Sequence, residues 1–163
     1  MLELVKRLDK KDIRIRTREK IPVSKNWVNK LEKLTISKLL TRYGEYGLRT
    51  GVKVGNYWFC VLDFDKRGWT KLIRNKRISY IKTRQGFHLY LKIGGDLPNN
   101  HQLFYQGNRI GDLLSYGRQA VGAGSKHPTG IFYEWKQRGK WFWTFANLEE
   151  LKEELGKFGL EFR

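Results

Sequence analysis

The stretch YWFCVLDFD, residues 57–65, decides the fold because it is a nearly continuous apolar run that ends in two carboxylates. Such a run is typical of a strand that is buried on both faces of a sheet. In a strand, side chains two residues apart point to the same face, so Asp63 and Asp65 should project side by side. Two like charges at that spacing are costly unless a cation or a proton lies between them. The run therefore predicts a buried strand with a candidate cation site at its end.

The residues that follow this strand predict a mostly antiparallel sheet. Residues 78–84 and 87–93 alternate between apolar and polar side chains around a Gln-Gly turn, which is typical of a hairpin. Residues 108–116, 118–124 and 131–136 have patterns that would continue the same sheet. Before the hairpin, a short helix is expected at residues 69–74.

The N-terminal part of the chain predicts both helices and short strands. Residues 2–8 have the apolar spacing of a helix, whereas residues 13–15 alternate as in a short strand. Residues 27–43 predict one or two helices, with Thr35 as a candidate N-cap. A strand is expected at residues 46–51.

The length of 163 residues suits one compact domain with a real core. We expect a single domain over residues 1–163, with an N-terminal α/β unit at residues 1–54 and the sheet at residues 55–146. A closing helix is expected over residues 147–163, capped by Asn147. The predicted fold class is α+β, with helices against a mostly antiparallel sheet.

The charge of the chain favours a polyanionic partner. There are 33 Lys and Arg residues against 16 Asp and Glu, which gives a formal net charge of +17. No acid occurs between Asp65 and Asp96, where the basic residues are Lys66, Arg67, Lys71, Arg74, Lys76, Arg77, Lys82, Arg84 and Lys92. A heat-adapted surface would also be rich in Lys, but Glu usually accompanies it, and here Glu is scarce before the C-terminal tail. We therefore expect contact with nucleic acid.

Composition also excludes several classes of protein. The single cysteine, Cys60, rules out an internal disulfide and a cysteine-cluster zinc site. No stretch approaches the roughly 20 apolar residues of a membrane span, and the N-terminus lacks the apolar core of a signal peptide. We expect a cytoplasmic protein with no membrane contact.

Three further features could carry chemistry. His88 lies in the second strand of the predicted hairpin beside basic residues, where it could donate to a phosphate oxygen. Asp112 could add a third carboxylate. The loop GAGSKHPTG, residues 122–130, offers glycines whose backbone N–H groups could bind an anion, together with Ser125, Lys126 and His127. A lone strand histidine and an ordinary turn remain the plain alternatives, and the loop lacks the spacing of a P-loop.

Together these features resemble the archaeo-eukaryotic primase superfamily, in the primase-polymerase (prim-pol) branch carried by plasmids and viruses. The Asp-x-Asp motif of that family is matched by Asp63-Phe64-Asp65, and its histidine motif by Thr83, Gly86 and His88. Its third acidic motif is matched by Ile110-Gly111-Asp112 with one residue inserted. Before these motifs, the prim-pol branch has a Pro-x-x-Lys-x-Trp pattern, which is matched by Pro22, Lys25 and Trp27. After them it has a Ser-x-His…Thr-Gly…Tyr-x-Trp pattern, which is matched by Ser125, His127, Thr129, Gly130, Tyr133 and Trp135. The likeness spans residues 21–135.

The resemblance implies a DNA primase and polymerase core that transfers nucleotides from dNTPs or NTPs to a 3′-hydroxyl in plasmid or viral replication. It implies an RRM-like sheet beside the N-terminal unit, with the active site in the cleft between them. It also implies two divalent ions, Mg²⁺ or Mn²⁺, held by Asp63, Asp65 and Asp112. The implied nucleotide-binding residues are His88, Lys82, Arg84, Arg118, Ser125, Lys126 and His127. The template and primer would contact Lys66, Arg67, Lys71, Arg74, Lys76 and Arg77.

The sequence departs from the family pattern in places and leaves two alternatives open. Gly111 directly before Asp112 weakens the third motif, and the helicase or helical accessory domain that the family often carries is expected only as a partner. A metal-dependent nuclease would need the same acids and the same basic surface. A non-catalytic RRM-like module would bind nucleic acid without metal, although the aromatic motif of RRM domains is not evident.

Overall fold

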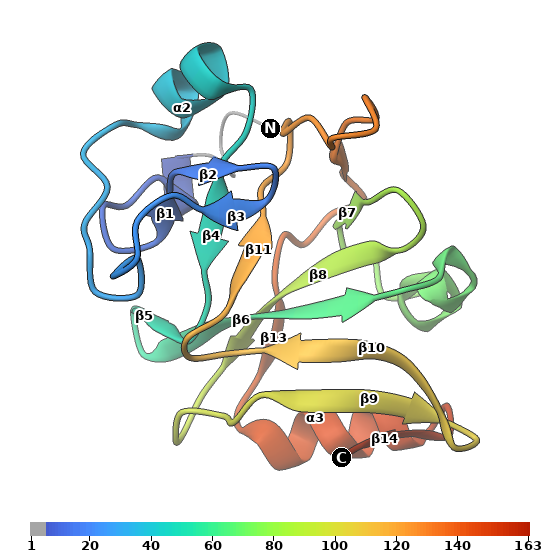
Figure 1. The fold of residues 1–163 in the computed structure, drawn as a ribbon. Coiled ribbons are helices and arrows are strands. Elements are labelled where there is room, and N and C mark those ends of the chain that lie inside the picture. The colour runs from blue at the N-terminus through green and yellow to red at the C-terminus, as the bar shows by residue number, and fades with distance from the viewer. Residues whose placement is uncertain (1–5) are drawn as a thin grey trace.

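The computed structural model describes residues 6–163, which are organised around a nine-stranded sheet (Figure 1). The strand order is β12-β7-β8-β6-β10-β9-β14, with β5 on β6 and β13 on β8. Neighbours run antiparallel except for β13, which is parallel to β8. The bounds are β5 (Val52–Val54), β6 (Tyr57–Phe64), β7 (Tyr80–Lys82), β8 (Phe87–Ile93), β9 (His101–Tyr105), β10 (Asn108–Leu114), β12 (Glu134–Lys136), β13 (Trp143–Phe145) and β14 (Leu160–Phe162).

A second layer, built mostly from the N-terminal part, lies against this sheet. It contains a three-stranded sheet, a two-stranded hairpin and one helix. Their bounds are β1 (Arg14–Ile15), β4 (Gly47–Arg49) and β11 (Gln119–Val121) for the sheet, β2 (Thr17–Arg18) and β3 (Ile21–Pro22) for the hairpin, and α2 (Ile36–Tyr43) for the helix. The α+β fold class is therefore confirmed.

Strand β6 is buried on both faces, as its apolar run predicts. Cys60, Leu62 and Phe64 belong to one core, which also contains residues of the 3-10 helix η1 (Arg67–Ile73) and of α3 (Leu148–Gly156). Phe59 and Val61 belong to the other core, with residues of α2 and β4. Because the faces alternate, Asp63 lies on the side of the second layer.

Several predicted elements match the structure. The strand at residues 57–64 and the hairpin of β7 and β8 are confirmed. Thr35 caps α2 by accepting a hydrogen bond from the Lys38 amide, and Asn147 caps α3 by accepting one from the Glu150 amide. The short helix expected near residue 69 is present as a 3-10 helix.

Other expectations were wrong or only partly met. Residues 118–124 were expected to continue the large sheet, but β11 pairs with β4, because Ala120 and Val121 pack into the core of the second layer. The closing helix ends at Gly156, after which β14 adds to the edge of the large sheet at β9. The expected first helix begins in residues 1–5, which lie outside the described residues, although residues 6–8 are helical.

Residues 27–34 form turns instead of the expected helix, because two arginines bind their carbonyl groups. Arg49 donates to the carbonyls of Trp27 and Lys30. Arg14 donates to the carbonyls of Glu32 and Lys33, at 3.1 and 3.3 Å. These carbonyls point toward the arginines, whereas in a helix they would point along the helix axis. The two arrangements are incompatible, so the helix does not form. Helical periodicity alone could not reveal these distant donors.

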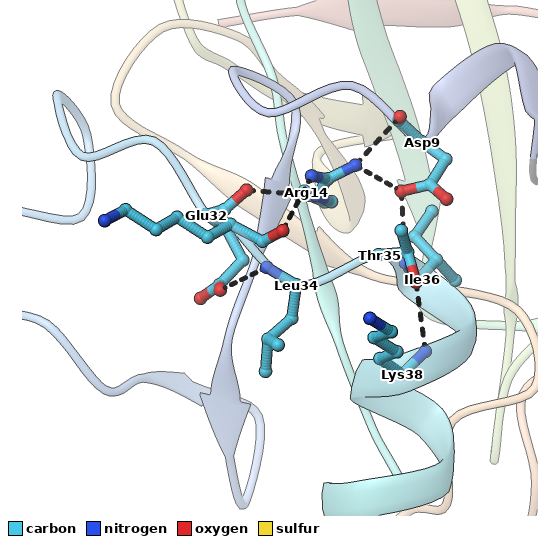
Figure 2. Close-up of polar contacts among 8 residues, drawn as sticks. Asp9, Arg14, Glu32, Leu34, Thr35, Ile36 and Lys38 are labelled. Carbon is cyan, nitrogen blue, oxygen red and sulfur yellow. Dashed lines mark hydrogen bonds and ion pairs between the residues drawn. The ribbon is translucent and has the colours of Figure 1, made fainter.

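Arg14 also connects this segment to the start of α2 (Figure 2). Its guanidinium donates to Asp9 Oδ1 at 2.6 Å, and the same oxygen accepts the Ile36 amide at 3.0 Å. The side chains of Arg14 and Asp9 are only 6% and 19% exposed. A buried pair of this kind is costly to break, because the remaining charge loses its partner.

We therefore expect Arg14→Met to lower the free energy of unfolding by about 3 kcal/mol, because Asp9 and the carbonyls would be left without a donor. Equilibrium urea unfolding measures this value. Arg16→Met is the matched control, because Arg16 is 38% exposed and pairs with Glu32 at 3.4 Å. Its expected cost is about 1 kcal/mol or less. Equal losses in both variants would contradict a structural role for Arg14.

Candidate active site

Three predicted site residues lie in one row across three adjacent strands. In the register of the large sheet, Asp63 of β6 is directly opposite His88 of β8 on one side and Asp112 of β10 on the other. Residues opposite each other in a sheet share a face, so the three side chains project toward the second layer. Asp65 follows β6, and its amide is bound by the Ile110 carbonyl at 2.9 Å.

Two glycines allow the neighbouring backbones to approach the end of β6. A Cβ atom at Gly86 would lie 1.6 Å from the Phe64 carbonyl oxygen, and one at Gly111 would lie 2.1 Å from the Asp63 carbonyl oxygen. Neither distance is compatible with a side chain. Pairing between β9 and β10 also shifts register between Arg109 and Gly111. The close approach of the Asp63 carbonyl gives a physical reason for the glycine that precedes Asp112.

A pocket of about 250 Å³ opens beside this row. Asp63, Asp65 and His88 line it from the large sheet. Arg84 lines it from the turn between β7 and β8. Lys20, His127 and Tyr133 line it from the other side. The pocket thus joins carboxylates of the large sheet to basic groups from outside that sheet.

Lys20 was missed by the sequence analysis. It lies at the tip of the β2–β3 hairpin, where Glu19 and Lys20 have φ values of 51° and 69°. The backbone of Lys20 is fixed on both sides, because its amide donates to Glu45 Oε2 at 3.2 Å and its carbonyl accepts from Gln119 Nε2 at 2.8 Å. Glu-Lys is not a typical pair for such a turn, which usually favours Asn or Gly. No local signal could have identified this residue.

The two acids of β6 have different electrostatic surroundings. Burial raises the pKa of Asp63, but nearby basic groups lower it by more, so this pKa lies below its ordinary value. The most important of these groups is His88, whose Nε2 lies 3.3 Å from Asp63 Oδ1; Arg109 and Lys20 contribute less. Burial and then the charges of Asp63 and Asp112 raise the pKa of Asp65. The charged form of Asp65 is thus disfavoured by burial and by the neighbouring acids.

His127 and Lys20 form the basic side of the pocket. His127 Nδ1 accepts the Thr129 amide at 3.1 Å, so a neutral ring carries its proton on Nε2. That Nε2 lies 3.4 Å from Lys20 Nζ. Slight burial and then the charges of Lys20 and Arg84 lower the pKa of His127, which favours the neutral ring. Two donors this close together could both donate to one anionic oxygen beside them.

Asp112 and Arg118 line a neighbouring pocket of about 250 Å³. There Asp112 Oδ2 accepts from Arg109 at 2.5 Å. The structure therefore places Asp112 beside Asp63 in the sheet but directs its carboxylate partly to an arginine. Arg118 lies near Asp112 and not among the residues that line the first pocket.

The other predicted nucleotide-binding residues lie around the first pocket without lining it. Ser125 is fully buried, and its hydroxyl accepts the Tyr46 amide at 3.1 Å, which gives it a structural contact. Lys126 is exposed, and Lys82 Nζ lies 3.9 Å from Glu134.

The predicted nucleic-acid surface follows β6 directly. Lys66, Arg67, Lys71, Arg74 and Arg77 are exposed along η1 and the turn after it, whereas Lys76 is half-buried and paired with Glu154. Arg67 also donates to the Arg84 carbonyl at 2.7 Å, which connects this surface to the first pocket.

The donor set fits a divalent ion that is only partly held by protein. Among residues 6–163, no three His, Cys, Asp or Glu side chains form a group that could hold a metal ion. Mg²⁺, however, is commonly bound by one or two carboxylates, with waters and substrate phosphates as the other ligands. Asp63 and Asp65 supply such a pair. Burial and then the charges of Asp63 and Asp112 raise the pKa of Asp65, and a nearby cation would stabilise its charged form.

A comparison with protein families identifies the family of this chain. The model for "Bifunctional DNA primase/polymerase, N-terminal" matches residues 4–153. None of the curated proteins matches the chain significantly. No helix in the described part of the chain has the length and apolar character needed to cross a bilayer. The family match covers most of the sequence, as the ordered motifs predicted, and the chain therefore belongs to the N-terminal domain family of bifunctional DNA primase/polymerases.

Proposed function

We propose that this domain extends a nucleic-acid chain on a DNA template, by transfer of nucleotides from dNTPs or NTPs to a 3′-hydroxyl in plasmid or viral replication. The observation that carries the proposal is the pocket with carboxylates on one side and Lys20, Arg84 and His127 on the other. A nucleoside triphosphate bound with a divalent ion presents both a cation and an anion. The two sides of the pocket suit these two charges.

The acids would hold the divalent ions, either Mg²⁺ or Mn²⁺. Asp63 and Asp65 would bind both ions, and Asp112 would bind the one nearer the primer end after its carboxylate turns from Arg109. When bound, such a pair of ions lowers the pKa of the attacking hydroxyl and neutralises charge on the leaving pyrophosphate. His88 Nε2 lies 3.3 Å from Asp63 Oδ1, but His88 would not itself be a ligand of the ions.

The basic side would bind the triphosphate. Lys20 Nζ and His127 Nε2 are two donors at one point, and Arg84 adds a charge beside them. His88 would contact the phosphates from the sheet. Lys82, Arg118, Ser125 and Lys126 remain proposed helpers, and of these Arg118 lines the neighbouring pocket.

Template and primer would lie along the exposed basic residues of η1 and the turn that follows. Phosphate contacts of this kind carry no sequence information, so binding should be largely independent of sequence. A helicase or helical accessory domain and a cytoplasmic location remain predictions.

Asp63→Asn and Asp65→Asn should each lower primer extension at least about a thousandfold, because the amide keeps the shape but loses the charge that holds the cation. Folding and DNA binding should persist. The assay is extension of a primer–template with Mg²⁺ or Mn²⁺ and each nucleotide set, beside a melting curve and a binding titration.

Asp96→Asn is the matched control, because Asp96 is an exposed acid outside the pocket. Wild-type extension by a folded Asp63→Asn protein would remove the proposed role of the acids. A product shorter than the primer, without need of nucleotide, would identify a nuclease. Loss of DNA binding in the Asn variants would favour a non-catalytic module.

His88→Ala should weaken apparent nucleotide affinity or turnover while metal binding stays near that of the wild type. His88 is 5% exposed and reaches Asp63 through Nε2, so its loss removes a donor and no hard oxygen ligand. Calorimetry with Mn²⁺ and kinetics with varied nucleotide separate the two effects. If His88→Ala abolished metal binding as Asp63→Asn is expected to, the assigned role would be wrong.

Affinity for primed DNA should fall steeply with salt, with a log–log slope of several units between about 50 and 200 mM. The reason is that each phosphate contact by Lys or Arg releases counterions. Fluorescence anisotropy with two unrelated sequences measures both the slope and the independence of sequence. A flat response would exclude the proposed electrostatic surface.

A further inference from the structure

A further hollow, of about 760 Å³, lies beside the part of β8 that pairs with β13. The first residues of β8 pair with β7, whereas Leu91, Lys92 and Ile93 pair with β13. The residues that line this groove come from the end of β8, from the segment after η1, from β13 and the residues before it, and from Arg7 near the N-terminus. None of them lines the proposed catalytic pocket.

The groove combines basic and aromatic side chains. Its basic residues are Arg7, Lys76, Lys92 and Lys140, and its aromatic residues are Trp141, Phe142 and Trp143. No acid is among the described residues that line it. Of the four basic residues, Lys76 has an acidic partner nearby, Glu154.

Three of the basic groups lie against the aromatic rings. The Arg7 guanidinium is 4.5 Å from the centroid of the Trp141 ring, and Lys92 Nζ is 4.6 Å from that of Phe142. Lys76 Nζ is 5.6 Å from the Trp143 ring. An aromatic face attracts a cation but does not neutralise it as a carboxylate would. The rings therefore position positive charge that stays available to an anion.

Placing these charges together has a cost within the protein alone. Burial, and then the charges of Arg7 and Lys10, lower the pKa of Lys92. Like charges that crowd a concave surface raise the local concentration of anions. The cost would be relieved by a ligand that brings several negative charges at once.

We propose that this groove binds a single-stranded nucleic-acid segment, at a site separate from the catalytic pocket. Proteins that hold single strands combine basic grooves with aromatic or arginine surfaces on which bases stack, as this groove does. A stiff duplex would fit a concave site with a half-buried lysine poorly, because it cannot bend into it. A lone phosphate would use the charges but not the rings.

The groove and the catalytic pocket lie near opposite ends of the same strand, β8. His88 and Lys92 lie four residues apart on β8, which corresponds to about 13 Å at the rise of a strand. The identification of the bound segment as template rests on the proposed function, whereas the binding itself does not.

The test is anisotropy of a labelled oligothymidylate with full-length protein, in buffer with chelator and without nucleotide. Each phosphate contact to a single strand contributes about 0.7 to the log–log salt slope. The triple variant Arg7→Gln/Lys92→Gln/Lys140→Gln should therefore lower the slope by about 2, and Lys140→Gln alone by about 0.7.

Trp141→Ala should weaken binding with an unchanged slope. Melting curves identify any variant that is unfolded, and the single variant at exposed Lys140 then carries the test.

Lys53→Gln is the matched control, because Lys53 is an exposed lysine against an aromatic ring, 4.1 Å from Trp58, outside the groove. Slopes equal to that of Lys53→Gln would overturn the proposal. It would also be overturned if unlabelled duplex competed as well as a single strand, or if the groove variants lost binding of inorganic triphosphate but kept the oligonucleotide. Failure of wild-type primer extension would count against the proposed function and leave this result standing.

Discussion

The backbones of β8 and β10 can approach the end of β6 because Gly86 and Gly111 carry no side chain. A Cβ atom at either position would overlap a carbonyl oxygen of β6. This close approach fixes the register that places Asp112, Asp63 and His88 in one row. A shift of one residue would turn the side chains of the shifted strand to the other face. The candidate site is therefore a consequence of backbone packing, and the glycines contribute to it without any chemistry of their own.

The two cores fix the position of this row, and the two acids of β6 have different surroundings. Because β6 is buried between both layers, its register cannot change without exposing apolar side chains. The apolar run of β6 ends at Asp63, and Asp65 follows the strand. Asp63 has His88 as a partner, whereas burial and the neighbouring acids raise the pKa of Asp65. The site thus contains one stabilised carboxylate and one that favours a cation.

Local patterns predicted the parts of the fold that depend on local physics. The apolar run of β6, the Gln-Gly hairpin and the caps Thr35 and Asn147 each act within a few residues. Residues 27–34 were mispredicted because their carbonyls bind Arg14 and Arg49, which are distant in sequence. Lys20 reaches the pocket because Glu45 and Gln119 hold the β2–β3 hairpin in place. The sequence of that hairpin does not predict its turn. Contacts between distant segments leave no periodic signal, so sequence patterns found the acids of the pocket but only part of its basic side.

The division of charge between the layers has a physical consequence for function. The acids lie on the large sheet, whereas Lys20 and His127 come from outside it, so the complete pocket exists only when the layers are packed together. Opposite charges on one layer could pair with each other directly and would then be less available to a ligand. Here Lys20 Nζ faces His127 Nε2 instead of a carboxylate. The groove near Lys92 follows the same principle, because aromatic rings hold its cations without neutralising them. In both places the fold places some of its positive charge beside groups that do not neutralise it, which leaves that charge available to phosphates from solution.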